Sequence, residues 1–315
     1  MRQISVIICS LNPRPDYFGR VLESLRAQTL ATDQWELLLV DNASDRPLAD
    51  SWDLSWHPHH LKLREEEQGL TPARLRGIKE SDGQLIVFVD DDNLLASNYL
   101  ERALEVQQAY PFVSVFGAGA LTPEFEVEPH PHVGPLCPLL GLRTVSRVRW
   151  TNNPKDSPCI PWGAGLCAKR ATAMAYVQLV ERMGIGHLLD RRGPHLFSGG
   201  DDLFSWVSAH AGCGFGLFPT LRITHLVRAE RVSEPYLLRL INDHAYSHAI
   251  LRYVLCGELP PRLHPPAKIR ILLHGVRRGH FSMKCHLASA SGVERAVRDI
   301  ASEDVHPLES GEFAS

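Results

Sequence analysis

Three consecutive aspartates, Asp90–Asp92, are the strongest chemical signal in this sequence and directly follow the apolar run Leu85–Val89. Adjacent carboxylates repel one another, which raises their pKa values. In an extended segment Asp90 and Asp92 point to the same side. Oxygen ligands at that spacing suit Mg²⁺ or Mn²⁺, and such an ion can hold a diphosphate. The alternative explanation is a set of acidic caps before the next helix.

A second acidic pair, Asp201 and Asp202, follows the glycine pair Gly199–Gly200. Glycines let the backbone approach a ligand closely, and either carboxylate can act as a general base toward an attacking hydroxyl. Helix capping explains this pair better when it is considered alone. His225 follows a short predicted strand. It is a candidate functional residue only if its imidazole binds a metal ion together with the carboxylates.

The elements that must position these residues alternate between strand and helix in the first part of the chain. Apolar runs and helical spacing predict strands at 4–9, 37–40, 61–63, 85–89 and 112–116, and helices at 16–28, 71–83 and 97–110. This order predicts an α/β fold with a largely parallel sheet, in which ligands bind at the carboxyl ends of the strands. The polar segments Cys9–Asn12 and Asp41–Asp45 come at such ends, although polar residues end strands in any α/β protein.

The second half of the chain is less regular. Five prolines between Thr122 and Pro138 predict a loop or linker. Beyond it we expect strands at 145–150, 215–218 and 221–224, helices at 170–183 and 201–211, and mostly helix from Ser233.

Composition excludes several classes of protein. With 315 residues, 44% of them hydrophobic, and a formal net charge of −3, the chain is neither disordered nor a dedicated nucleic-acid binder. No apolar run reaches the roughly 18 residues of a membrane-spanning helix, and the N-terminus lacks the pattern of a signal peptide. The 7 cysteines form no C-x-x-C pair, which favours reduced thiols and a cytoplasmic location.

Taken in order, four parts of the sequence resemble the inverting GT-A glycosyltransferases of family 2: Ser5–Asn12, Val40–Asp45, Gly69–Arg74 with Val87–Asn93, and Gly199–Asp202 with His225–Arg231. The resemblance covers about residues 3–232. It implies a GT-A catalytic domain over 1–232, with a Rossmann-like, mostly parallel sheet flanked by helices. Its nucleotide-binding half would span about 1–120 and its acceptor half about 121–232, and a helical C-terminal extension would span 233–315.

The resemblance also implies roles for individual residues. Cys9, Ser10, Asn12 and Asp41 would line the nucleoside pocket, and Arg74 would lie near the base or the phosphates. Asp90 and Asp92 match the outer residues of the family's D-x-D motif, with Asp91 between them in the nucleotide-sugar site. Asp92 and His225 would hold Mn²⁺ or Mg²⁺. Asp202 would be the base, with Asp201 as the alternative because the family usually has Glu-Asp here. Trp162 and Gly163 would contribute to a wall of the sugar site, with core packing as an equal alternative for Trp162. Leu11 stands where the family has an aromatic residue, which alters the contact with the base.

The implied reaction is a metal-dependent hexosyl transfer from a nucleoside-diphosphate sugar to an acceptor hydroxyl, as in polysaccharide biosynthesis. A metal at Asp92 neutralises the leaving diphosphate, and Asp202 takes the proton of the hydroxyl. A single base without a covalent nucleophile predicts inversion. The expected acceptor is a glycan, a lipid-linked molecule or a small molecule, and no nucleic-acid partner is expected.

Other functions stay open at this point. A non-catalytic nucleotide-sugar-binding protein of the same fold is one alternative, and a sugar-1-phosphate nucleotidyltransferase is another. The latter needs a loop rich in glycine and arginine after the first strand, whereas Cys9–Arg20 holds one glycine. Gly163–Ala168 matches a dinucleotide motif, but it lies mid-chain rather than after the first strand, and no P-loop motif is present.

Histidines and a basic segment complete the candidates. His57–His60 and His130–His132 lie in proline-containing segments, and His244 and His248 are one helical turn apart without an evident third ligand. All of them are interpreted as solvated or structural. Residues 261–285 contain six Lys/Arg and no Asp or Glu. An amphipathic helix here would bind the inner face of an anionic membrane. The favoured interpretation is an ordinary helix whose basic face is exposed to solvent.

Overall fold

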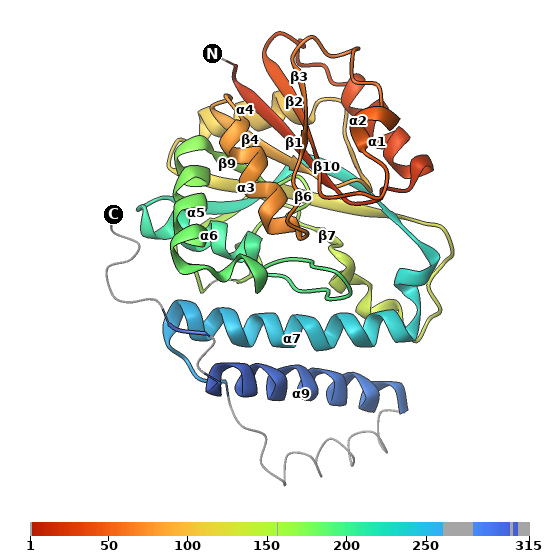
Figure 1. The fold of residues 1–315 in the computed structure, drawn as a ribbon, viewed down its shortest axis with the longest axis vertical. Coiled ribbons are helices and arrows are strands. Elements are labelled where there is room, and N and C mark those ends of the chain that lie inside the picture. Colours follow the sequence, from red (N-terminus) through yellow and green to blue (C-terminus); the bar gives the residue numbers. More distant parts are fainter. Residues whose placement is uncertain (1, 156, 261–279, 303–304, 308–315) are drawn as a thin grey trace.

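The computed structural model describes residues 2–155, 157–260, 280–302 and 305–307. Its strands form one sheet in the order β3-β2-β1-β4-β9-β6-β10-β5 (Figure 1). In that order the strands are β3 (His60–Arg64), β2 (Trp35–Asp41), β1 (Ile4–Ser10), β4 (Leu85–Val89), β9 (Cys167–Lys169), β6 (Val113–Phe125), β10 (Gly214–Val227) and β5 (Asn93–Leu95). Two short strands pair outside this path, namely β7 (Arg143–Thr144) with β6 and β8 (Arg149–Thr151) with β10.

Most paired residues of the sheet lie in parallel ladders. β3, β2, β1 and β4 pair in parallel, and so do β6 and β10. The short strand β9 runs antiparallel to both β4 and β6 and joins the two parallel parts. The α/β class and the mostly parallel sheet expected from the sequence are therefore confirmed.

Helices cover both faces of this sheet, because alternate residues of β1 and β2 point to opposite sides. One face packs against α1 (Pro15–Arg26) and α4 (Tyr99–Ala109). The other packs against α3 (Leu70–Glu80), α5 (Arg170–Met183) and α6 (Gly200–His210). Every residue of β4 is buried, which explains why its sequence is an unbroken apolar run. The remaining short elements are α2 (Leu48–Ser51), η1 (Gly134–Leu140), η2 (Ser157–Cys159), η3 (Ile185–His187) and η4 (Ala229–Val232).

Three expectations about the second half were wrong in detail. The proline-rich loop expected from Thr122 begins later, because β6 continues to Phe125 in parallel pairing with β10. The two strands expected at 215–218 and 221–224 are one strand, β10, whose ladder shifts register between Phe218 and Arg222, where Pro219 cannot donate a ladder hydrogen bond. Of the strand expected at 145–150, only Arg149 and Trp150 form a strand, as part of β8, and β7 ends just before the expected range.

Two long helices follow the sheet. α7 (Glu234–Cys256) packs beneath it, and α9 (His280–Ala301) lies beside α7 on the outer side (Figure 1). Arg295 of α9 bonds to Asp243 of α7 at 2.7 Å, and Tyr246 bonds to Asp299 at 2.8 Å. The division of the chain at residue 232 stays a prediction.

The basic segment 261–285, for which membrane contact was the less favoured alternative, falls mainly at residues 261–279, outside the described residues. Within the part of the chain that the structure describes, no helix has the length and apolar character needed to cross a bilayer.

Candidate active site

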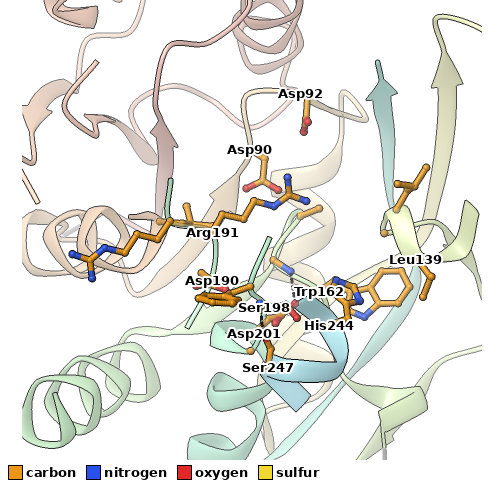
Figure 2. Close-up of a pocket in the computed structure, with 18 of the residues that line it drawn as sticks. Asp90, Asp92, Leu139, Trp162, Asp190, Arg191, Ser198, Asp201, His244 and Ser247 are labelled. Carbon is orange, nitrogen blue, oxygen red and sulfur yellow. Dashed lines mark hydrogen bonds between the residues drawn. The ribbon is translucent and has the colours of Figure 1, made fainter. Parts of the chain in front are cut away.

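A cavity of about 920 Å³ lies at the carboxyl ends of β1 and β4. Its wall also includes residues of α3, η1, the segments 162–164 and 190–202, the end of β10 with the segment that follows it, and α7. This is where ligands bind in open α/β sheets, and the volume is at the upper end of the range for small-molecule sites. Figure 2 shows Asp90 and Asp92 toward one end of the cavity and Trp162, Asp201 and His244 toward the other.

Most of the predicted site residues line this one cavity. They are Cys9, Ser10, Arg74, Asp90, Asp91, Asp92, Trp162, Gly163, Asp201, Asp202 and His225. They come from segments far apart in the sequence, as expected if strand ends converge. The roles of these residues stay predictions.

Two predicted nucleoside contacts, Asn12 and Asp41, do not line the cavity. The Asp41 carboxylate is buried and accepts hydrogen bonds from the backbone N–H groups of Ser44 (2.9 Å) and Leu48 (3.1 Å). Burial acts to raise the pKa of Asp41, but these hydrogen bonds and Arg64 lower it below its ordinary value. Both oxygens are thus occupied in holding the loop after β2. Asn12 supports the same loop by bonding to Asp45 at 3.1 Å.

The three aspartates after β4 differ in their surroundings. Burial raises the pKa of Asp90, against the opposing charge of Arg74. Burial and the neighbouring Asp92 raise the pKa of Asp91 to about 6, and Ser10 donates a hydrogen bond of 2.5 Å to its carboxylate. Asp92 is also buried, yet the charges of Arg231 and His225 outweigh burial and lower its pKa. Asp92 is therefore the member of the cluster that is most strongly held in its ionised form.

Asp92 and His225 meet because β5 pairs antiparallel with β10 and places Asn93 opposite His225. His225 Nε2 lies 3.6 Å from Asp92 Oδ2. Arg231 Nη1 lies between them, 2.9 Å from Asp92 Oδ2 and 3.0 Å from His225 Nε2. The sequence analysis did not single out Arg231, although it ends one of the segments that carry the family resemblance.

The donor set at this corner fits Mn²⁺ or Mg²⁺ with a phosphate ligand. Asp92 Oδ2 and His225 Nε2 lie 3.6 Å apart and both contact Arg231 Nη1, so a metal ion held by this pair would take the place of that guanidinium. Mg²⁺ is commonly bound by one or two carboxylates plus substrate phosphates. Among the described residues no group of three His, Cys, Asp or Glu side chains is arranged to hold a metal. A metal at Asp92 and His225 would therefore need further ligands from a diphosphate or from water.

The second acidic pair begins α6. Gly199 has φ +137°, a conformation that favours glycine, and a Cβ on Gly200 would overlap the carboxylate of Asp190. Asp201 accepts hydrogen bonds from the backbone N–H groups of Gly163 (3.2 Å) and Asp202 (3.1 Å). Burial, Asp201 and Asp190 together raise the pKa of Asp202 to about 8. The backbone thus orients Asp201, while Asp202 borders the cavity as a carboxyl group with a raised pKa.

A buried ion pair between Arg74 and Asp190 joins α3 to the start of α6. Arg74 Nη1 lies 2.9 Å from Asp190 Oδ2, and the two side chains are only 5% and 7% exposed. Asp190 also accepts hydrogen bonds from Thr71 Oγ1 (3.3 Å) and the N–H of Gly200 (3.2 Å). Asp190 has a left-handed backbone, φ +54°, and lies in an irregular segment where no sequence spacing points to it. The sequence analysis missed it for this reason.

Arginines supply the positive charge of the cavity. Those that line it are Arg74, Arg191, Arg192, Arg228 and Arg231. The positive charge of Arg191 acts to lower the pKa of both Asp90 and Asp92. Figure 2 shows Arg191 between Asp90 and Asp190. Guanidinium groups beside carboxylates that can share a metal form a site suited to phosphate oxygens.

The model of glycosyl transferase family 2 matches residues 5–159, about half of the chain. The chain belongs to glycosyl transferase family 2. The matched region includes the aspartate triplet and Arg74 but ends before Asp201 and His225. The roles expected of these later residues therefore depend on the geometry of the cavity.

Curated proteins named as glycosyltransferases match part of the chain. It is 29% identical over 104 residues to Glycosyltransferase AglE of Haloferax volcanii, a match of 32% of this chain and 34% of that protein. It is 28% identical over 111 residues to an uncharacterized glycosyltransferase of Haemophilus influenzae, a match of 35% of this chain and 36% of that protein. The chain thus spans about a third of the length of these relatives.

Among solved structures, the mannosyltransferase PcManGT from Pyrobaculum calidifontis, in complex with GDP-Man and Mn²⁺, resembles the whole chain. The alignment covers 100% of this chain and 78% of that one, with a TM-score of 0.52 and 20% sequence identity. This likeness concerns the fold, and it confirms the GT-A architecture expected from the sequence.

Replacing Asp190 with asparagine tests the buried ion pair. Asp190→Asn keeps the shape of the side chain but leaves the Arg74 guanidinium buried without its partner, so we expect the free energy of unfolding to fall by about 3 kcal/mol. Glu105→Gln, which breaks the exposed pair with Arg102 on α4, is the control and should change it little. Urea unfolding measures both, and equal effects of the two substitutions would contradict the assignment.

The raised pKa of Asp202 predicts a pH-dependent stability. Its pKa rises from an ordinary value of 3.8 to about 8, so the folded state binds more protons than the unfolded state between these values. The contribution of Asp202 to stability is then complete below about pH 4 and is lost as pH rises through about 8. Asp202→Asn should therefore make the free energy of unfolding fall less steeply between about pH 5 and pH 8. Identical slopes for the two proteins would show that Asp202 keeps an ordinary pKa.

Proposed function

We propose that this chain is a metal-dependent, inverting glycosyltransferase that transfers a hexosyl group from a nucleoside-diphosphate sugar to an acceptor hydroxyl. One observation carries the proposal. The aspartate triplet with its arginines and the carboxylate pair Asp201 and Asp202 border the same cavity, at opposite ends. Such a cavity can hold a diphosphate at one end and activate a hydroxyl at the other. The family match and the names of the relatives support the same chemistry.

The donor is bound at the Asp92 end. Cys9 and Ser10 end β1 beside the aspartates, where they can contact the nucleoside, while Arg191 and Arg231 attract the phosphate oxygens. Asp92 and His225 would hold Mn²⁺ or Mg²⁺, and the bound ion would supply positive charge that neutralises the leaving diphosphate. PcManGT, which shares the fold, was solved with both GDP-Man and Mn²⁺, and this supports a divalent metal here.

Asp202 is proposed as the general base. Asp201 is occupied by two backbone N–H groups, which favours Asp202 as the group that receives the proton. The acceptor oxygen forms a bond to the anomeric carbon as its proton moves to Asp202. The bond from that carbon to the diphosphate oxygen breaks, and the electron pair leaves with the diphosphate. Since one displacement occurs and no side chain bonds to the sugar, the configuration at the anomeric carbon inverts.

Calorimetric titration tests the donor site. UDP, GDP and TDP are each added, with and without Mn²⁺, to wild type and to Asp92→Ala. One nucleotide should bind wild type tightly with Mn²⁺, and Asp92→Ala should bind it with no dependence on the metal, because the carboxylate nearest His225 is gone.

The control for this titration is Asp33→Ala, which alters an exposed aspartate outside the cavity and should behave as wild type. Failure of all three nucleotides to bind wild type under any condition would contradict the proposed function.

A further inference from the structure

α7 lines the cavity at the end farthest from Asp92. Figure 2 shows His244 and Ser247 of α7 at the same end of the cavity as Trp162 and Asp201. The residues of α7 that border the cavity are Tyr236, Ile241, His244, Ala245, Ser247, His248 and Leu251. A donor held by its diphosphate at Asp92 would leave this end of the cavity for a second molecule.

Two hydrogen bonds fix the rotation of α7 about its axis. Asp243 accepts from the N–H of Leu196 at 2.8 Å, and Ser247 accepts from the N–H of Ser198 at 3.1 Å. These acceptors are four residues apart and lie on one strip of the helix. His244 and His248 occupy the adjoining strip, also four residues apart, and this strip borders the cavity. The contacts that dock the helix therefore hold His244 in the cavity wall, at the same end as Asp201, and they place the more exposed His248 one turn further along the helix.

Trp162 provides a flat apolar surface next to the carboxylate pair. The guanidinium of Arg143 lies over the indole, 3.2 Å from the ring centroid, and donates a hydrogen bond of 2.8 Å to the carbonyl of Ile160. Arg143 thus holds the ring in one orientation. The N–H of Gly163, the next residue, donates a hydrogen bond to Asp201. This bond fixes the backbone beside the indole relative to the Asp201 carboxylate. A sugar ring can lay its apolar C–H face on such a surface while its hydroxyls stay free for hydrogen bonds.

The charges at this end favour an uncharged ligand. Burial and Arg191 lower the pKa of His244, against the opposing effect of Asp243, and burial and Arg252 lower the pKa of His248. Both imidazoles are then neutral near pH 7 and each offers one donor and one acceptor. Near pH 8, where Asp202 ionises, its negative charge would repel an anionic group that entered here. Hydroxyl groups, which both donate and accept, suit this set of side chains.

We propose that the α7 end of the cavity binds an uncharged saccharide as the acceptor, with its ring on Trp162 and its hydroxyls bonded to His244 and His248. This places one hydroxyl at Asp202. The inference rests on the proposed function and specifies its acceptor. It also changes the interpretation of His244 and His248, which the sequence alone suggested were solvated or structural.

Saturation-transfer NMR with the methyl glycosides of glucose, galactose, mannose and N-acetylglucosamine tests this proposal on the full chain with a bound nucleoside diphosphate. At least one glycoside should bind wild type. Loss of a ring contact or a hydrogen bond should weaken that binding about tenfold in Trp162→Ala and in His244→Ala. Matched controls are Trp150→Ala, on the exposed side of β8, and His286→Ala, on the exposed side of α9.

The same samples are titrated with the nucleoside diphosphate, which shows that each variant is folded and separates the two proposals. Nucleotide binding without any glycoside binding, or glycoside binding that is equal in all variants, would overturn the saccharide site alone. Absence of nucleotide binding as well would overturn the proposed function.

Discussion

The cavity depends on the buried ion pair between Arg74 and Asp190. Arg74 comes from α3 in the family-matched half of the chain, and Asp190 comes from the irregular segment before α6. A buried guanidinium is costly without a counter-charge, so the pair constrains both segments to one arrangement. Gly163 and Gly200 lack the side chains that would collide with this pair. The position of the carboxylate pair relative to the aspartate triplet follows from this constraint.

The pKa values of Asp92 and Asp202, at the two ends of the cavity, are shifted in opposite directions. This difference matches their two proposed roles, binding a cation and accepting a proton. Arg231 and His225 keep Asp92 ionised despite its burial, as a group that holds a cation must be. At the other end burial and neighbouring carboxylates raise the pKa of Asp202 to about 8, near the pH at which a general base works most efficiently. Opposite pKa shifts of carboxylates in one cavity are a common basis for assigning different roles to them.

The sequence predicted the parts of the site that local patterns determine. The apolar run of β4 and the helix at Arg170–Met183 were predicted with their observed limits, because burial and helical spacing leave a periodic signal. β9 was not predicted, since three residues inserted antiparallel between β4 and β6 show no period. Asp190, Arg231 and the imidazoles of α7 reach the cavity through long-range contacts, which no spacing along the chain records. Asp41 lies at the predicted strand end, and its carboxylate accepts hydrogen bonds within its own loop, which its position in the sequence did not indicate. Its role toward a nucleoside stays a prediction.

The most direct test of the account is the release of nucleoside diphosphate from UDP-, GDP- and TDP-linked sugars at about pH 8, where Asp202 is available as a base. Methyl glycosides are added as acceptors, with Mn²⁺ present. Wild type should release one nucleoside diphosphate, and Asp202→Asn should release it at least about 100-fold more slowly while it binds that nucleotide as tightly. Equal rates for the two proteins would contradict the role of Asp202. Nucleotide binding with no release by wild type would identify a binding protein of the same fold rather than a transferase.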